Sequence, residues 1–284
     1  MKTRMPVLIS AGTLALSLTA CGGGAAEEEP AEAAAESPEE GGGGSVLDLV
    51  AGLGESTQSV DNYTLTMDIL TTESPLGEGE VEMSIVYEVS DDPSALQVTA
   101  IMPFLGESTL ALMEMTGADV SGLTAEEAGT SVMLYPEGQD PLLSNNLGQY
   151  GDTPWVTAGG EALGDVPADV FDVEALPEVA SAIASLENVS EAGTEEVGGV
   201  ETTVIEGTMT TEEYEALSAE QSAALLQVLG SDFSGTLDIG VWVDDNGFPL
   251  RMEFADEVSD VSMEFSALNE TTVEIPTEDE IGTM

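Results

Sequence analysis

Carboxylates are the reactive groups that this sequence offers in number. Of its 284 residues, 56 are Asp or Glu, none is His and one is Cys. Without His, catalytic triads and imidazole metal sites are excluded. Paired carboxylates can hydrolyse a glycosidic bond, but with so many acids no single pair is informative. We therefore expect a protein that is not an enzyme, with no catalytic residues, no metal site and no cofactor.

One acidic segment has the residue types of a calcium loop. Asp244, Asp245, Asn246 and Gly247 are spaced like the first part of such a loop. The later ligands are missing, because Phe248-Pro249-Leu250 follow. A type I′ hairpin turn accounts for the same residues. We favour the turn over a calcium site.

The single cysteine, Cys21, ends an apolar run that begins with the cations Lys2 and Arg4. Leu18-Thr19-Ala20-Cys21 resembles a bacterial lipobox, so residues 1–20 resemble a lipoprotein signal peptide. A transmembrane helix is the alternative, but it needs about 20 apolar residues. Ordinary secretion with a chance cysteine is another. The resemblance implies acyl chains such as palmitate on Cys21, and a location on the extracytoplasmic face of the cell membrane.

Charge sets the partners that the mature chain can have. Once residues 1–20 are removed, Arg251 is the only cation, and the formal charge is about 1 − 56 = −55. Nucleic acid is excluded, because its phosphates need Lys and Arg. Self-repulsion calls for screening ions, so we expect a saline setting and non-specific cations at the acidic surface. A lineage habit of acidic surfaces is the alternative. We expect Arg251 to pair with a strand carboxylate, or else with an anionic headgroup.

Composition divides the mature chain into three parts. Residues 21–45 are rich in Gly, Ala and Glu and predict a disordered tether. Residues 46–275 carry core-forming patterns and predict one domain, and residues 276–284 predict a frayed tail.

Alternating apolar residues predict an antiparallel, mainly β sheet with a few helices. Strands are expected near 63–69, 81–89, 96–102, 110–115, 132–135, 155–156, 237–243, 250–254, 261–265 and, as an option, 272–275. A hairpin is expected over 195–207, with Gly198-Gly199 as the turn between its two strands. Helices are expected at 46–53, at 176–186 and at 211–229, the last with Thr211 as its cap.

Two segments carry a family resemblance. Residues 197–208 (VGGVETTVIEGT) and residues 241–254 (VWVDDNGFPLRMEF) resemble hairpins of the actinobacterial LppX/LprG-type lipoproteins, which are similar in fold to the LolA lipoprotein carriers. The resemblance implies an α+β, mainly β fold, in which helices cover the concave face of a curved antiparallel half-barrel. It also implies a lipid or a lipidated molecule as the ligand.

Such a ligand needs an apolar cavity, which the strand methionines and their neighbours could line. The expected lining residues are Met67, Ile69, Met83, Ile85, Tyr87, Val98, Met102, Leu110, Leu112, Met252, Phe254 and Met263. The alternative is that they fill a solid core, in which case the chain is a cell-envelope interaction or sensor domain with a salt-adapted surface.

Overall fold

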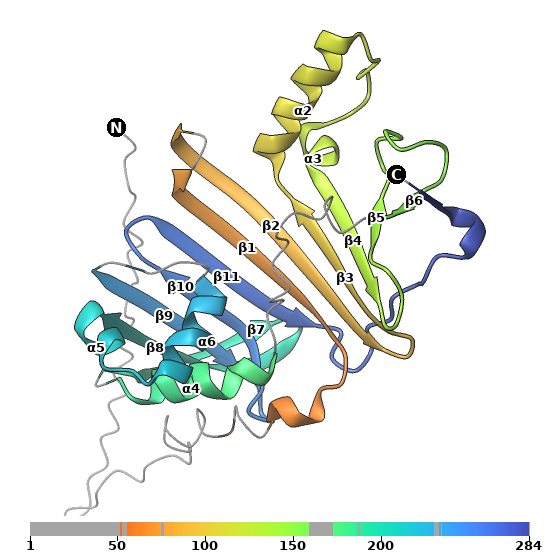
Figure 1. Ribbon diagram of the computed structural model, residues 1–284. Coiled ribbons are helices and arrows are strands. Elements are labelled where there is room, and N and C mark those ends of the chain that lie inside the picture. The colour runs from red at the N-terminus through yellow and green to blue at the C-terminus, as the bar shows by residue number, and fades with distance from the viewer. Residues whose placement is uncertain are drawn as a thin grey trace, which may run out of the picture. The chain divides into compact units, whose positions relative to one another are not determined.

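Twelve strands of the described residues form one curved sheet, in the order β12-β6-β5-β4-β3-β2-β1-β11-β10-β9-β8-β7 (Figure 1). The computed structural model describes residues 52, 56–74, 77–158, 173–186, 188–229, 233 and 235–283. They belong to one compact unit, 44–284. Cys21, the signal peptide, the tether and nearly all of the helix predicted at 46–53 lie outside the described residues.

The N-terminal half contributes one side of the sheet. After η1 (Thr57–Ser59), its strands are β1 (Tyr63–Ser74), β2 (Gly77–Asp91), β3 (Ser94–Ile101), β4 (Thr130–Pro136), β5 (Leu142–Ser144) and β6 (Trp155–Thr157). Neighbouring strands in this series are antiparallel. The alternating pattern therefore predicted β1, β2 and β3 correctly, and it also located β4 and β6.

The segment predicted as a strand at 110–115 is a helix, and this prediction was wrong. Residues 103–116 form α2 (Pro103–Thr116), which a turn connects to α3 (Ala125–Ala128). Pro103 occupies the first turn, where its missing N–H costs nothing. Gly117 ends the helix in the left-handed region, with φ 82°, and its N–H donates to the carbonyls of Met113 and Glu114.

The C-terminal half contributes the other side of the sheet and the covering helices. Its elements are η2 (Val173–Ala175), α4 (Leu176–Ala184), β7 (Ser190–Val197), β8 (Val200–Thr210), α5 (Thr211–Glu215), α6 (Ala219–Leu229), β9 (Thr236–Val243), β10 (Pro249–Ala255) and β11 (Ser259–Ser266). Residues 211–229 are thus two helices, not one. The first is capped by Thr210 rather than by Thr211, because Glu213 completes a capping box with Thr210.

The turn at 244–247 connects β9 to β10, as expected, but it is not of type I′. That type needs positive φ at both central residues, and Asn246 is not among the residues with positive φ, whereas Gly247 has φ 80°. The Asp244 carboxylate accepts hydrogen bonds from the backbone N–H of Asn246 at 2.9 Å and of Phe248 at 2.7 Å. This carboxylate therefore stabilises the turn itself.

The last residues are ordered into the sheet, against the prediction of a frayed tail from residue 276. Residues 278–280 form η3 (Glu278–Glu280), and β12 (Ile281–Thr283) pairs in parallel with β6. The optional strand at 272–275 is not formed. Instead, Val273 is buried in a small cluster with Ala95, Leu134 and Leu142.

The main core lies between the concave face of the sheet and α4 and α6. Side chains of β1 and β8–β11 pack there against both helices, and Leu65, Met209, Leu225 and Met263 are fully buried. The described residues thus form a mainly β, half-barrel fold whose concave face is covered by helices over part of its width.

Candidate functional site

Four of the residues predicted to line a cavity lie in the filled core. Met252 and Phe254 are each 1 % exposed, Met263 is 0 % exposed and Met67 is 5 % exposed. They pack with the side chains of α4 and α6 in one cluster. In this structure these four residues are therefore packed in a solid core, as the alternative interpretation has it.

Five other predicted lining residues lie on the same concave face of the sheet, on β1, β2 and β3, where the cover by α4 and α6 ends. They are Ile69, Met83, Ile85, Tyr87 and Val98. The strand register places Ile69 opposite Met83, Met67 opposite Ile85, and Tyr87 opposite Val98. Of these, Val98 is buried, whereas Met83, Ile85 and Tyr87 are half-buried.

The same register extends this surface across β2, β3 and β4. We call it the inner strip, and it consists of Val81, Met83, Ile85, Tyr87, Val89, Leu96, Val98, Ala100, Met133 and Tyr135. All of them except Val98 are half-buried, and none is charged. Only Tyr87 and Val89 pack against the main core. The inner strip is therefore an apolar stretch of the concave face beside the region that α4 and α6 fill.

Its two tyrosines indicate how apolar the strip is. Burial raises the pKa of both the Tyr87 and the Tyr135 hydroxyl above the ordinary value. The Tyr135 hydroxyl donates to the Met133 sulfur at 3.5 Å, which is a weak acceptor. The strip thus offers a soft, adaptable apolar surface with hydroxyl groups at a few points.

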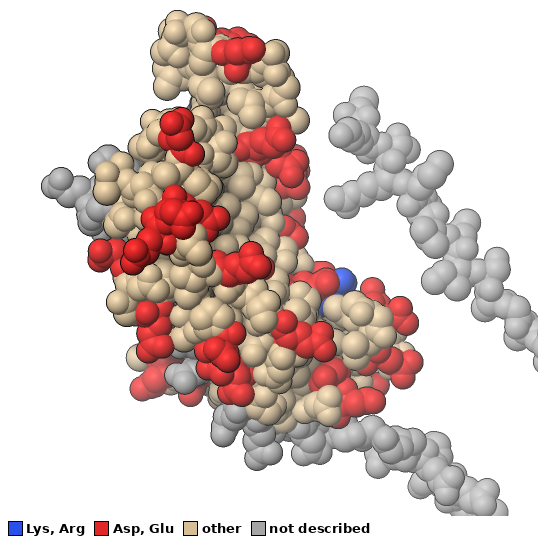
Figure 2. All heavy atoms as spheres, turned by 90° about the vertical axis from the view of Figure 1, so that its right-hand side faces the viewer, with Lys and Arg blue, Asp and Glu red and all other residues tan. Residues whose placement is uncertain are grey.

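The convex face has the opposite character. On β2 it carries Glu80, Glu82 and Glu88, whose positions alternate with those of the strip. Two hollows of about 450 and 520 Å³ lie on this face, and acidic side chains line both. Figure 2 shows acidic groups spread over the surface that it presents, with a basic side chain visible at one point. The convex face is therefore acidic over β2 and β8–β11, whereas over β3–β5 it carries the small buried cluster of Ala95, Leu134, Leu142 and Val273.

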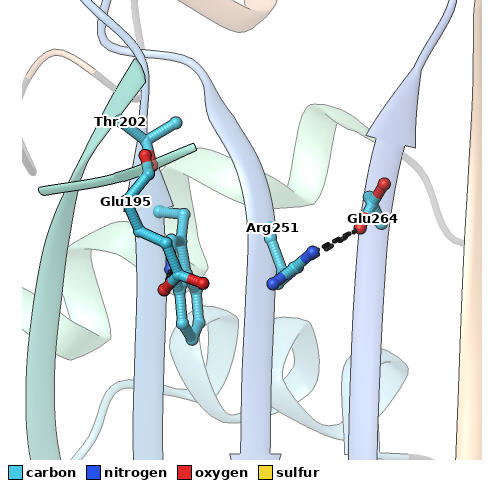
Figure 3. Close-up of polar contacts among 5 residues, drawn as sticks. Glu195, Thr202, Arg251 and Glu264 are labelled. Atoms are coloured by element: carbon cyan, nitrogen blue, oxygen red, sulfur yellow. Dashed lines mark hydrogen bonds and ion pairs between the residues drawn. The ribbon is translucent and has the colours of Figure 1, made fainter. Parts of the chain in front are cut away.

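Arg251, the one Lys or Arg among the described residues, lies on the convex face (Figure 3). The Arg251 guanidinium is 2.8 Å from the Glu264 carboxylate on β11 and lies 5.5 Å from the Trp242 ring centroid. The Trp242 indole N–H donates to Glu195 at 2.8 Å. The expected strand ion pair is confirmed. Because Arg251 alternates with the buried Leu250 and Met252, it faces away from the strip, and so it is not placed to hold a headgroup there.

The last three predicted lining residues are not on the sheet. Met102 precedes α2, and Leu110 and Leu112 lie on it, with Leu112 61 % exposed. The structure does not bring them together with the residues of β10 and β11. The prediction that Leu110 and Leu112 lie on a strand was wrong, because residues 103–116 form a helix.

The predicted set also missed part of the inner strip. Leu96 and Tyr135 join it, beside the strand methionine Met133, through the pairing of β3 with β4. Their alternation was visible in the sequence, but the face that they share with β2 depends on register across three strands.

No family model matches this sequence, and no curated protein matches it. Among solved structures, the chain is similar to the lipoprotein LppX of Mycobacterium tuberculosis, with 13 % identity, a TM-score of 0.43, and coverage of 80 % of this chain and 97 % of that one. LprF of Mycobacterium bovis has 13 % identity and a TM-score of 0.43, with 82 % and 99 % covered. A LolA superfamily protein of Nitrosomonas europaea has 10 % identity and a TM-score of 0.22, with 84 % and 99 % covered. These names come from the two groups that residues 197–208 and 241–254 resemble, and at such identities the likeness concerns the fold alone.

Proposed function

We propose that this chain is a lipoprotein, anchored through Cys21 to the extracytoplasmic face of the cell membrane, that binds a lipid or a lipidated molecule on the inner strip. The observation that carries the proposal is the strip itself. An acidic protein keeps an uncharged, half-buried surface of aliphatic, Met and Tyr side chains on the concave face of its sheet.

The energy of such binding comes from removing apolar surface from water. Contact that covers half the surface of about ten methylenes contributes roughly 4 kcal/mol, at about 0.8 kcal/mol for each fully buried methylene. Methionine and tyrosine suit acyl chains of varied shape, because Met is flexible and Tyr is rigid and amphipathic. This function is binding and not catalysis.

The test uses the mature chain with Cys21→Ser, so that its own acyl chains do not compete. Uptake of a fluorescent fatty acid and native mass spectrometry of co-purifying lipid are measured. Ile85→Glu places a charge on the inner strip, and we expect at least about a tenfold loss of probe affinity. Val86→Glu is the matched control, because Val86 is the next residue on β2 and faces the convex side. Equal binding by the two variants would refute the site.

A second function is favoured by the filled core around Met252, Phe254 and Met263. It is a cell-envelope interaction or sensor domain without a lipid ligand. The absence of both probe uptake and co-purifying lipid in the unsubstituted chain would support it over lipid binding.

A further inference from the structure

Helix α2 carries the two most exposed large apolar side chains of the described residues, Leu112 and Met115, and a third exposed one, Leu105. Leu105 is 38 % exposed, Leu112 is 61 % exposed and Met115 is 85 % exposed. Exposure therefore increases along α2, away from the sheet. Figure 1 shows α2 projecting from the sheet beyond the ends of β3 and β4. With 14 residues, it is about 21 Å long.

These side chains share one face of the helix. Leu105, Leu112 and Met115 are separated by seven and by three residues, which is the spacing of a single helical stripe. Glu107 and Glu114 are also seven residues apart, so they lie together on a different stripe. At the top of Figure 2 the projecting end is mostly tan, with one acidic patch, and the sequence places Glu114 and Asp119 at this end of the helix. α2 thus presents an apolar ridge on an otherwise acidic protein.

The base of α2 is held firmly. The Met102 N–H donates to the Gly129 carbonyl at 3.1 Å. Gly106 lies so close to α3 that a Cβ there would be 1.7 Å from the Ala125 carbonyl oxygen. The projection of the ridge is therefore a feature of the fold, set by the contact between α2 and α3.

We propose that this ridge inserts into the surface of an electrically neutral lipid layer. The chain preceding the described residues supports a lipid occupant. Residues 21–45 are the predicted tether, and a flexible chain of about 24 residues would span roughly 27 Å r.m.s.. An acylated Cys21 would hold the body within that reach of a bilayer. The inference thus uses the proposed anchor, but not lipid binding on the inner strip.

Charge narrows the choice of occupant. A second copy carries the same formal charge of −53, or about −55 when mature, and would be repelled. An anionic lipid surface would be repelled in the same way. A neutral surface has no such penalty, and it gains the burial of Leu112 and Met115. With 14 residues, α2 does not span a bilayer, so it enters only the interfacial region.

The test is co-sedimentation of the mature Cys21→Ser chain with phosphatidylcholine vesicles. Each large apolar side chain that becomes buried contributes more than about a tenfold factor. We therefore expect Leu112→Glu combined with Met115→Glu to reduce binding about a hundredfold or more. Leu226→Glu, at an exposed apolar position of α6, is the matched control and should bind normally. Vesicles that also contain phosphatidylglycerol should bind less, and about 1 M salt should restore their binding.

A label provides a second readout that does not depend on affinity. The Cys21→Ser chain has no cysteine, so Met115→Cys carries a polarity-sensitive fluorophore at one position. A blue shift with phosphatidylcholine vesicles is expected. Equal binding by the double variant, or a dimer that the same substitutions disrupt without any vesicle binding, would overturn the proposal. Fatty-acid uptake measured on the same preparations separates this outcome from failure of the inner-strip site.

Discussion

The contact between α2 and α3 offers the sharpest test of the described geometry, through Gly106→Ala. A Cβ at this position would lie 1.7 Å from the Ala125 carbonyl oxygen and 2.7 Å from the Gly129 backbone nitrogen. Real Cβ atoms essentially never approach closer than 3.0 Å. The two backbone segments must therefore separate by at least the difference between 3.0 and 1.7 Å, which is 1.3 Å.

The size of the effect follows from two opposing contributions. Overpacking costs about 1–3 kcal/mol, and the upper end applies because the atoms met are backbone atoms that cannot rotate away. Alanine within a helix regains about 1 kcal/mol relative to glycine. We therefore expect a net destabilisation of about 2 kcal/mol. That corresponds to opening of the α2–α3 segment about thirty times more often.

Amide hydrogen exchange is the suitable assay, because the loss is local. The Gly129 N–H, which donates to Ala125 at 2.9 Å, should exchange about thirtyfold faster in Gly106→Ala. Ser108→Ala is the control, since this exposed position of α2 gains helix propensity without a clash. Exchange at Gly129 that is unchanged or slower in Gly106→Ala would refute the close approach of the two helices.

Three further outcomes are expected. Met263→Ala removes a side chain that is 0 % exposed, and it should lower the free energy of unfolding by about 2–5 kcal/mol in urea titrations. Hydrogen bonds from the Thr210 backbone N–H and then from the Thr210 hydroxyl hold the pKa of Glu213 below its usual 4.5. The contribution of Glu213 to folding stability is therefore complete above that pH and is lost as the pH falls through the lowered pKa. Glu213→Gln should flatten this acid-side loss of the melting temperature, and an unchanged slope would contradict the expectation. Thermal melting of the unsubstituted protein should rise from low salt to about 1 M NaCl, where the Debye length is about 3 Å, and a midpoint that stays constant or falls would argue against charge repulsion.

The strands were predictable where one face of the sheet is buried and the other is solvated. Tyr63, Leu65 and Met67 alternate with Thr64 and Thr66 because α4 and α6 cover only one side of β1. Alternation of this kind is a local signal, and it placed β1, β2, β3, β9, β10 and β11 correctly. The pairing of β12 with β6 had no such signal, because three residues, Ile281–Thr283, carry no period.

The failure at α2 has a physical cause. The helix is apolar around much of its circumference, so residues 110–115 show no single buried stripe and resemble an alternating strand. Its composition nevertheless indicated a helix, because Leu, Ala, Met and Glu are strong helix formers and no β-branched run is present. Pro103 at the start and Gly117 at the end were further signals of a helix.

The candidate site was only partly predictable. Periodicity identified the apolar face, but it did not separate the filled core at Met252 and Met263 from the half-buried strip at Met83 and Ile85. That separation depends on how far α4 and α6 extend across the sheet, which is a tertiary property that no local pattern encodes.

The pairing of β1 with β11 has a consequence for when the protein can fold. Leu65 lies opposite Phe265. The middle of the sheet therefore cannot form until β11, the last strand but one in the sequence, has been made. Topologies with such distant partners have high contact order and fold slowly, on the scale of milliseconds to seconds. A chain whose sheet closes this late stays without its tertiary structure while it emerges from a ribosome, and it acquires that structure only after its last strands have been made.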